Sequence, residues 1–284
     1  MMNIMNARKR EFKFTKMTGT GNDFIVMDAR ETSLCVDLSI LARKVCTRRV
    51  SIGADGILAI EESGVADFIL RIFNPDGSEA EMCGNGARCA ALFAYHNGIA
   101  STTMQFETLA GLVEARIQGE DLVSIKMTQP KDIETGIELD VLDKRFMVHS
   151  INSGVPHAVV FIDDVENVQV DEIGRAIRMH QRFMPEGTNV DFVQVLKPGV
   201  IRVRTYERGV EKETLACGTG AVASAIISHW LKQCSDPAVT VEMAGGRLYV
   251  DFLETDGLYR DVWLKGKVER VYEGVYQGDI QGRD

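Results

Sequence analysis

The chain has 284 residues, 45% of them hydrophobic and 26% charged, which is typical of a globular protein with an ample core. Its formal net charge of −9 argues against a nucleic-acid-binding surface and against an anionic membrane as partner. No apolar run approaches the roughly 20 residues that a membrane-spanning helix needs. The first residues carry no secretory signal pattern, so we expect a cytoplasmic protein.

Cysteine usage points the same way. Six cysteines lie at positions 35, 46, 83, 89, 217 and 234, and they show no short spacing with histidines. In a reducing compartment these are expected to be free thiols, and no metal site is predicted.

Short apolar segments between glycine-rich turns predict strands at 24–28, 68–73, 112–117, 158–162, 192–195, 201–206 and 247–252. Helical patterns are fewer, at 37–45, 84–96, 170–180 and 218–232. This mixture predicts an α+β fold. The polar segment 129–140, which contains Pro130, is interpreted as a linker.

The sequence repeats itself once. The matched pairs are Gly21 with Gly154, Gly53 with Gly187, Cys83 with Cys217, and Gly111 with Gly245. The offset is 133 residues for the first pair and 134 for the others, and the order is the same. Such a series predicts a duplicated domain. We therefore expect two pseudo-symmetric lobes, 1–130 and 131–284, with an active-site cleft between them; the final strand, near 273–284, could instead join the first lobe.

Each repeat contains a cysteine followed by glycines and a helical pattern: Cys83-Gly84-Asn85-Gly86-Ala87 and Cys217-Gly218-Thr219-Gly220-Ala221. A cysteine at a helix N-terminus is expected to have a lowered pKa, and the free N–H groups there can bind a carboxylate. Two such cysteines facing one α-carbon could remove a proton from one face and deliver one to the other. That chemistry requires neither pyridoxal phosphate nor a metal. A duplicated structural turn is the alternative.

The motifs resemble the diaminopimelate epimerase family of lysine and peptidoglycan biosynthesis. The matching segments are KMTGTGNDF (16–24), GADG (53–56), FNPDGSEAEMCGNGARC (73–89), Pro156-His157, GTNVDF (187–192), YERG (206–209) and ETLACGTGA (213–221). The resemblance implies two lobes, each a mixed sheet wrapped around a central helix. It also implies interconversion of LL- and meso-2,6-diaminopimelate without a cofactor, with Cys83 and Cys217 as base and acid.

The resemblance further implies a set of site residues. Catalytic roles fall on Cys83, Cys217, His157 and Glu207, and substrate contacts on Asn22, Asn74, Gly84, Asn85, Asn189, Glu207, Arg208, Gly218 and Thr219. Amide and guanidinium donors suit two carboxylates, and an acidic side chain suits an ammonium group. Tyr272 resembles a position at the family's dimer interface, so a homodimer is expected.

Three positions depart from the commonest pattern of the family. Val155 stands where many members carry an asparagine, Gly56 where some carry a glutamine, and Thr18 where a histidine is frequent. These changes leave the cysteine chemistry intact. They keep open a racemase of another amino acid, such as a histidine-type racemase, and a non-catalytic ligand-binding relative.

Overall fold

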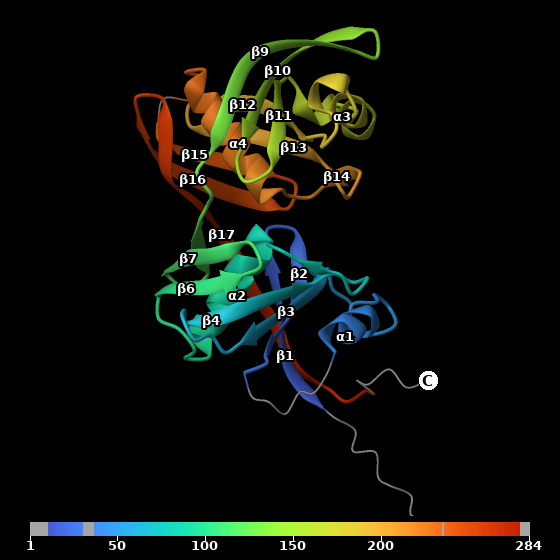
Figure 1. Ribbon diagram of the computed structural model, residues 1–284, viewed down its shortest axis with the longest axis vertical. Helices are drawn as coiled ribbons and strands as arrows, with labels where there is room; N and C mark the ends of the chain where they lie inside the picture. The colour runs from blue at the N-terminus through green and yellow to red at the C-terminus, as the bar shows by residue number, and fades with distance from the viewer. Residues whose placement is uncertain (1–10, 31–36, 235, 279–284) are drawn as a thin grey trace, which may run out of the picture. The chain divides into compact units, whose positions relative to one another are not determined.

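A computed structural model describes residues 11–30, 37–234 and 236–278. The chain forms two compact units (Figure 1). Of the described residues, unit 1 contains 11–19, 23–30, 37–117 and 268–278, and unit 2 contains 20–22, 118–234 and 236–267. The lobe division at residue 130 stays a prediction; these units divide between residues 117 and 118 and between residues 267 and 268.

The described residues of unit 1 form a mixed sheet with two helices. In chain order its elements are β1 (Phe12–Gly19), β2 (Asn22–Asp28), α1 (Leu38–Val45), β3 (Gly56–Glu61), β4 (Phe68–Phe73), β5 (Glu79–Ala80), α2 (Gly84–His96), β6 (Thr103–Thr108) and β7 (Gly111–Gln118). The β2–β3 and β4–β6 pairs are parallel, and the β3–β4, β4–β5 and β6–β7 pairs are antiparallel.

Unit 2 repeats this order and adds further strands. Its elements are β8 (Leu122–Lys126), β9 (Lys131–Val141), β10 (Lys144–Asn152), β11 (Pro156–Phe161), α3 (Val170–Arg178), β12 (Asn189–Lys197), β13 (Val200–Glu207), β14 (Lys212–Thr214), α4 (Gly218–Trp230), β15 (Ala238–Met243) and β16 (Gly246–Thr255). Two 3₁₀ turns cover Val165–Asn167 and Gln181–Phe183. β17 (Leu258–Tyr276) begins in this unit.

The duplication predicted from the sequence is confirmed by the strand pairing. β11–β12 and β13–β15 are parallel, as are β2–β3 and β4–β6 in unit 1. Phe24 lies opposite Gly56 in the first unit, and His157 lies opposite Asn189 in the second. The two strands of each parallel pair are therefore in the same register, with partners 32 residues apart in the sequence in both units. Each unit is therefore one copy of the same α+β arrangement.

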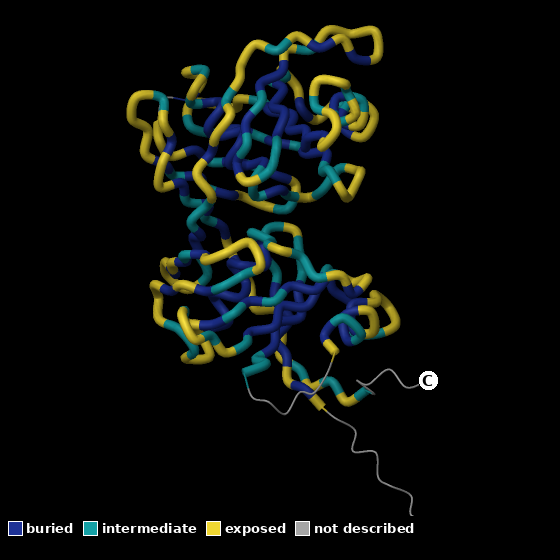
Figure 2. The backbone as a smooth tube through the Cα atoms, viewed as in Figure 1, coloured by how far each residue is buried: buried dark blue, intermediate teal, exposed yellow. Residues whose placement is uncertain are grey.

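A buried helix forms the centre of each unit. In α2 every residue from 85 to 94 is buried, and in α4 every residue from 220 to 228 (Figure 2). A helix that is buried on all sides must pack against strands all round, which matches its alanine-rich sequence. The first helix of each unit, α1 or α3, is amphipathic instead and packs through one face on its sheet.

Two expectations from the sequence were wrong. The segment 129–140 is no linker, because β9 covers most of it and pairs antiparallel with β10. Its apolar residues Ile133, Ile137 and Leu139 alternate with polar ones, which is the period of a half-exposed strand. The match of Gly111 with Gly245 was also wrong, because the strand register matches Gly111 with Gly246. Gly111 lies opposite Thr108, the last residue of β6, and Gly246 lies opposite Met243, the last residue of β15. Both Gly111 and Gly246 have a positive φ.

Strand β17 serves both units. Residues 258–266 pair with β16, and residues 263–267 also pair with β8. From residue 268 onward the strand pairs with β1, with Val268 opposite Gly19 and Tyr276 opposite Phe12. Unit 1 is therefore built from segments that lie far apart in the sequence.

Candidate active site

The two cysteines occupy the same position at the start of their helices, as the sequence predicts. Cys83 is the N-cap of α2 with φ −141° and ψ 115°, and Cys217 is the N-cap of α4 with φ −125° and ψ 114°. Each Sγ accepts a hydrogen bond from the backbone N–H three residues later, Gly86 or Gly220, at 3.4 Å. Two thiols thus sit at two helix N-termini, where backbone donors favour negative charge.

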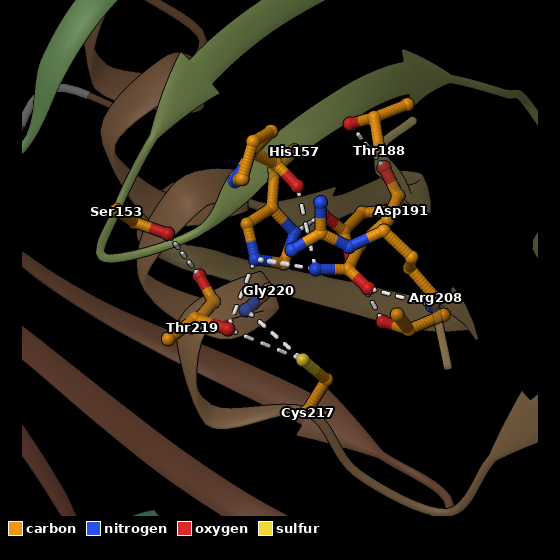
Figure 3. Close-up of polar contacts among 11 residues, drawn as sticks. Ser153, His157, Thr188, Asp191, Arg208, Cys217, Thr219 and Gly220 are labelled. Carbon is orange, nitrogen blue, oxygen red and sulfur yellow. Dashed lines mark hydrogen bonds and ion pairs between the residues drawn. The ribbon is translucent and has the colours of Figure 1, made fainter. Parts of the chain in front are cut away.

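Around Cys217 the structure assembles a buried polar cluster (Figure 3). Its Sγ lies 3.4 Å from Thr219 Oγ1, which lies 2.9 Å from His157 Nε2. On the other side of the ring, Nδ1 lies 2.7 Å from Asp191 Oδ2. The hydroxyl of Thr205 donates to the second carboxylate oxygen of Asp191 at 2.7 Å. His157 and Thr219, both predicted from sequence, are therefore in direct contact with each other.

The parallel register of β11 and β12 brings this cluster together. His157 lies opposite Asn189, and Asp191 is two residues further along β12, on the same face of the sheet. The amide oxygen of Asn189 accepts from the backbone N–H of Arg208 at 2.8 Å, so β13 ends beside the cluster. The guanidinium of Arg208 donates to the carbonyl of Glu186 at 3.0 Å.

Glu207 is the last residue of β13 and is half-buried. Burial raises the pKa of its carboxyl above the usual range, and the neighbouring Thr214 and His157 partly offset this effect. The carboxyl lies close enough to Cys217 for its charge to act on the thiol. The negative charge of Glu207 therefore disfavours the thiolate form of Cys217 in unit 2.

The expected lowering of the thiol pKa was wrong for Cys217. Burial raises the pKa of this thiol well above its ordinary value, and the negative charges of Glu207 and Asp191 raise it further. The hydrogen bonds from Thr219 and from the Gly220 N–H act in the opposite direction but are weaker. The helix end was visible in the sequence, whereas the burial and the carboxylates come from other strands. Cys217 is consequently a thiol at neutral pH.

In unit 1 the structure places Cys83, Gly84 and Asn85 together at the start of α2. The buried Asn85 accepts a hydrogen bond from the fully buried guanidinium of Arg88 at 2.6 Å. Asn74 lies in the turn after β4, where its backbone N–H and its amide both donate to Ser78, at 2.8 and 3.0 Å. Asn74 is thus held by local bonds within its own turn.

The remaining predicted positions have simple locations. Asn22 starts β2 and belongs to unit 2, together with Thr20 and Gly21. Gly218 is the first residue of α4, and a Cβ there would come within 2.9 Å of a side-chain carbon of Leu264. At Gly56 a Cβ would lie 2.7 Å from the carbonyl oxygen of Phe73, so a larger residue would need the β3–β4 pair to shift. The packing thus accounts for glycine at position 56.

Sequence reasoning missed Asp191, Thr205 and Ser153. All three are fully buried, and Ser153 donates to the Thr219 carbonyl at 2.8 Å. One signal was present, since Asp191 interrupts the apolar strand sequence NVDFVQV, and a buried acidic residue needs partners. Within the described part of the chain, no helix is long and apolar enough to cross a membrane.

Comparison with known proteins assigns the family. The family model for diaminopimelate epimerase matches residues 14–133 and 149–271. Curated diaminopimelate epimerases from Hydrogenobaculum sp. and Aquifex aeolicus are 42% and 44% identical to the chain, with 94% of the chain and 99% of each relative covered. One from Methanocella arvoryzae is 45% identical, with 95% of the chain and 98% of the relative covered.

Solved structures share the fold at low sequence identity. A phenazine biosynthesis protein of the PhzF family from Bacillus anthracis superimposes with a TM-score of 0.73 at 14% identity, covering 94% of this chain and 99% of that one. A probable proline racemase from Agrobacterium radiobacter K84 gives a TM-score of 0.70 at 18% identity, covering 96% and 94%. The sequence relatives, which match over almost their whole length, are the closer guide, and the chain belongs to the diaminopimelate epimerase family.

Proposed function

We propose that this chain interconverts LL- and meso-2,6-diaminopimelate without a cofactor, using Cys83 and Cys217 as the proton-transferring pair. The observation that carries the proposal is the equivalence of the two cysteines. Each is the N-cap of the central helix of its own unit, with nearly the same backbone angles and the same hydrogen bond from the third residue of the helix. Inversion of a carbon centre needs two proton-transferring groups, one for each face.

The two thiols take different roles in the ligand-free enzyme. Cys217 is protonated at neutral pH because it is buried near two carboxylates, so it is the acid. Cys83 is then the base for the substrate isomer that binds first to this form. The opposite isomer requires the reverse assignment, with Cys217 as thiolate. Lobes 1–130 and 131–284 would each supply one cysteine to the same α-carbon.

Binding of the reacting amino acid group follows from the helix ends. The N–H groups of Gly84 and Asn85 on one helix and of Gly218 and Thr219 on the other can hold the α-carboxylate. Charge that develops there as the α-proton leaves is stabilised by the same donors, which are fixed before the reaction.

The second amino acid end of the substrate would be held by Asn22, Asn74, Asn189, Glu207 and Arg208. Guanidinium and amide donors suit its carboxylate, and the Glu207 carboxylate suits its ammonium group. The backbone of Arg208 is already fixed by Asn189, which supports the assignment of these two residues to one subsite.

The test is solvent deuterium incorporation at the α-carbon of LL-diaminopimelate, followed by NMR with no cofactor added. We expect deuterium to enter, the meso isomer to form, and both to be lost in Cys83→Ala and Cys217→Ala. A reduced, folded enzyme that exchanges no α-proton would refute the proposal and would favour a ligand-binding relative.

The residue at position 155 favours a second candidate substrate. Val155, between β10 and β11, stands where many family members carry an asparagine. A racemase of another amino acid, such as a histidine-type racemase, would show exchange with that amino acid and none with diaminopimelate.

We also propose a homodimer in the cytoplasm. The end of β17 supports an interface, because Val271, Tyr272 and Val275 are about half exposed there: 50%, 47% and 49%. Sedimentation of the wild type and of Tyr272→Glu would test it, and an unchanged dimer in the variant would place the interface elsewhere.

A further inference from the structure

The contacts of Cys217 continue through the core of unit 2 as an unbroken series of polar groups. They run from Cys217 Sγ to Thr219 Oγ1 at 3.4 Å, then to His157 Nε2 at 2.9 Å, and from His157 Nδ1 to Asp191 Oδ2 at 2.7 Å (Figure 3). The His157 and Asp191 side chains are fully buried. Bulk water therefore has no direct access to the His157–Asp191 end of the series.

The chemistry of these groups sets the direction of each hydrogen bond. An ionised Asp191 only accepts, so Nδ1 of a neutral His157 must carry the ring proton. Nε2 is then an acceptor, and the Thr219 hydroxyl donates to it. The free lone pairs of that hydroxyl can accept from the thiol of Cys217. Along this series every donor thus points in one direction, from the sulfur through the ring to Asp191.

A Gly220 without a side chain makes this arrangement possible. A Cβ at this position would lie 2.4 Å from Asp191 Oδ1 and 3.2 Å from Thr205 Oγ1. The Oδ1 side of the carboxylate therefore packs directly on the first turn of α4, and the Thr205 hydroxyl donates to this same oxygen. These contacts fix the position of the Asp191 carboxylate, with its Oδ2 facing His157.

We propose that Asp191 is a positioning residue that fixes His157 with Nε2 toward Thr219, and that the Thr219 hydroxyl passes the proton of Cys217 to that nitrogen. The catalytic purpose of this relay rests on the proposed function, whereas the contacts among the four residues are independent of that function. Burial and acidic neighbours both disfavour loss of the Cys217 proton. This relay gives that proton an acceptor, His157, when Cys217 must act as the base.

The step is balanced. The S–H bond of Cys217 breaks as its proton moves to Thr219 Oγ1, and the Thr219 hydroxyl proton moves to His157 Nε2. A thiol and a neutral imidazole become a thiolate and an imidazolium, and the number of protons is unchanged. The imidazolium stays hydrogen-bonded to the Asp191 carboxylate. The reverse transfer restores the thiol after Cys217 has protonated the substrate.

The first experiment measures alkylation of Cys217 by iodoacetamide in the ligand-free Cys83→Ser protein, with mass spectrometry to identify the site. Simple electrostatics predicts that Asp191→Asn speeds the reaction, because a negative charge near the thiol is removed. The relay predicts the opposite. The neutral side-chain amide of this variant can donate to Nδ1, which moves the ring proton to Nε2 and blocks that nitrogen as an acceptor. We expect alkylation at pH 8 to fall about 10-fold.

The second measurement is direct. In the wild-type protein with ¹⁵N-labelled histidine, the His157 ring should be protonated at Nδ1 and not at Nε2, and Asp191→Asn should reverse this. His157→Gln identifies the resonances. A wild-type ring protonated at Nε2, or a variant that keeps the Nδ1–H form and alkylates at least as fast as its parent, overturns the proposal.

Thr219 provides the independent variants. Thr219→Val removes the hydroxyl at constant shape and should slow Cys217 alkylation about 10-fold, whereas Thr219→Ser should restore most of the rate. Ser228→Ala is the matched control, because it removes another buried hydroxyl of α4, bonded to the Ser224 carbonyl at 2.7 Å. Equal rates for Thr219→Val and Thr219→Ser refute the hydroxyl relay. These readouts use no substrate, so the absence of epimerase activity would refute the proposed function and leave this test intact.

Discussion

Replacing Gly220 by alanine should damage unit 2 far more than the equivalent change damages unit 1. The added methyl group at Gly220 would lie 2.4 Å from Oδ1 of the buried Asp191, whose carboxylate is held at Oδ1 by Thr205 and at Oδ2 by His157. At Gly86, the matched position of α2, the nearest atom is a side-chain methyl of Leu58 at 3.1 Å, which can move by a few tenths of an ångström. The same mutation therefore meets the fixed carboxylate of a residue in β12 when it is made in α4, and a flexible leucine of β3 when it is made in α2.

The magnitude follows from three contributions. Overpacking costs about 1–3 kcal/mol, and weakening a hydrogen bond to a buried charge costs about 1.5–3 kcal/mol. Alanine regains up to about 1 kcal/mol over glycine in a helix. We expect Gly220→Ala to lower the free energy of unfolding by about 2–4 kcal/mol, and Gly86→Ala to change it by about 1 kcal/mol or less.

Guanidinium chloride unfolding followed by tryptophan fluorescence measures this difference, because the chain has 2 tryptophans and both, Trp230 and Trp263, lie in unit 2. The signal therefore reports the unit that carries Gly220. Gly86→Ala should leave this transition close to that of the wild type. A Gly220→Ala protein whose tryptophan transition matches the wild type would refute the reasoning, since the Asp191 carboxylate would then have room to move.

Three further outcomes are expected. Because Glu207 raises the pKa of the Cys217 thiol, Glu207→Gln should make the alkylation rate of Cys217 rise at lower pH than in the wild type; an unchanged or more alkaline pH profile would contradict this. Burial lowers the pKa of His149, so the folded protein favours the neutral ring. The stability that this neutral ring contributes is present above the unfolded pKa of about 6.5 and is lost as pH falls through the lowered pKa of the folded state. His149→Gln should flatten that loss in unfolding midpoints taken between pH 7 and pH 5, and an equal loss in both proteins would place the cause elsewhere. Finally, a Cβ at Gly174 would lie 2.5 Å from the Cβ of the buried Tyr206, so Gly174→Ala should lower the free energy of unfolding by about 1–3 kcal/mol, and wild-type stability would show that α3 can shift on its sheet.

The features that the sequence predicts well are local. Helix α2 was predicted with the bounds it has, and α4 to within two residues at its end, because a cysteine N-cap, glycines and an alanine-rich run lie next to one another in the chain. The duplication was also visible, since its signal is similarity along the sequence. Strand β9 was missed because polar residues occupy one face of it and outweighed the alternating pattern.

The features that escaped prediction depend on contacts between distant strands. The sequence marks His157 and Asp191 as separate residues, and only the register of β11 on β12 places the ring next to the carboxylate. The error for the Cys217 pKa has the same origin. A helix end is a local property, whereas burial and the charges of Glu207 and Asp191 arise from the folded sheet.

The shared strand β17 affects how the protein is made on the ribosome. Strand β1 emerges early with β2 on one side, and its other neighbour is the part of β17 that begins at Val268. All of residues 118–267 must be synthesised first, which takes about 8–30 s at typical translation rates. During that time one edge of β1 lacks its partner, and unpaired edges are the places where chains aggregate. Unit 2 can therefore complete its fold before unit 1, although unit 1 is mostly encoded earlier, and a nascent chain stalled before residue 268 exposes an open sheet edge to chaperones.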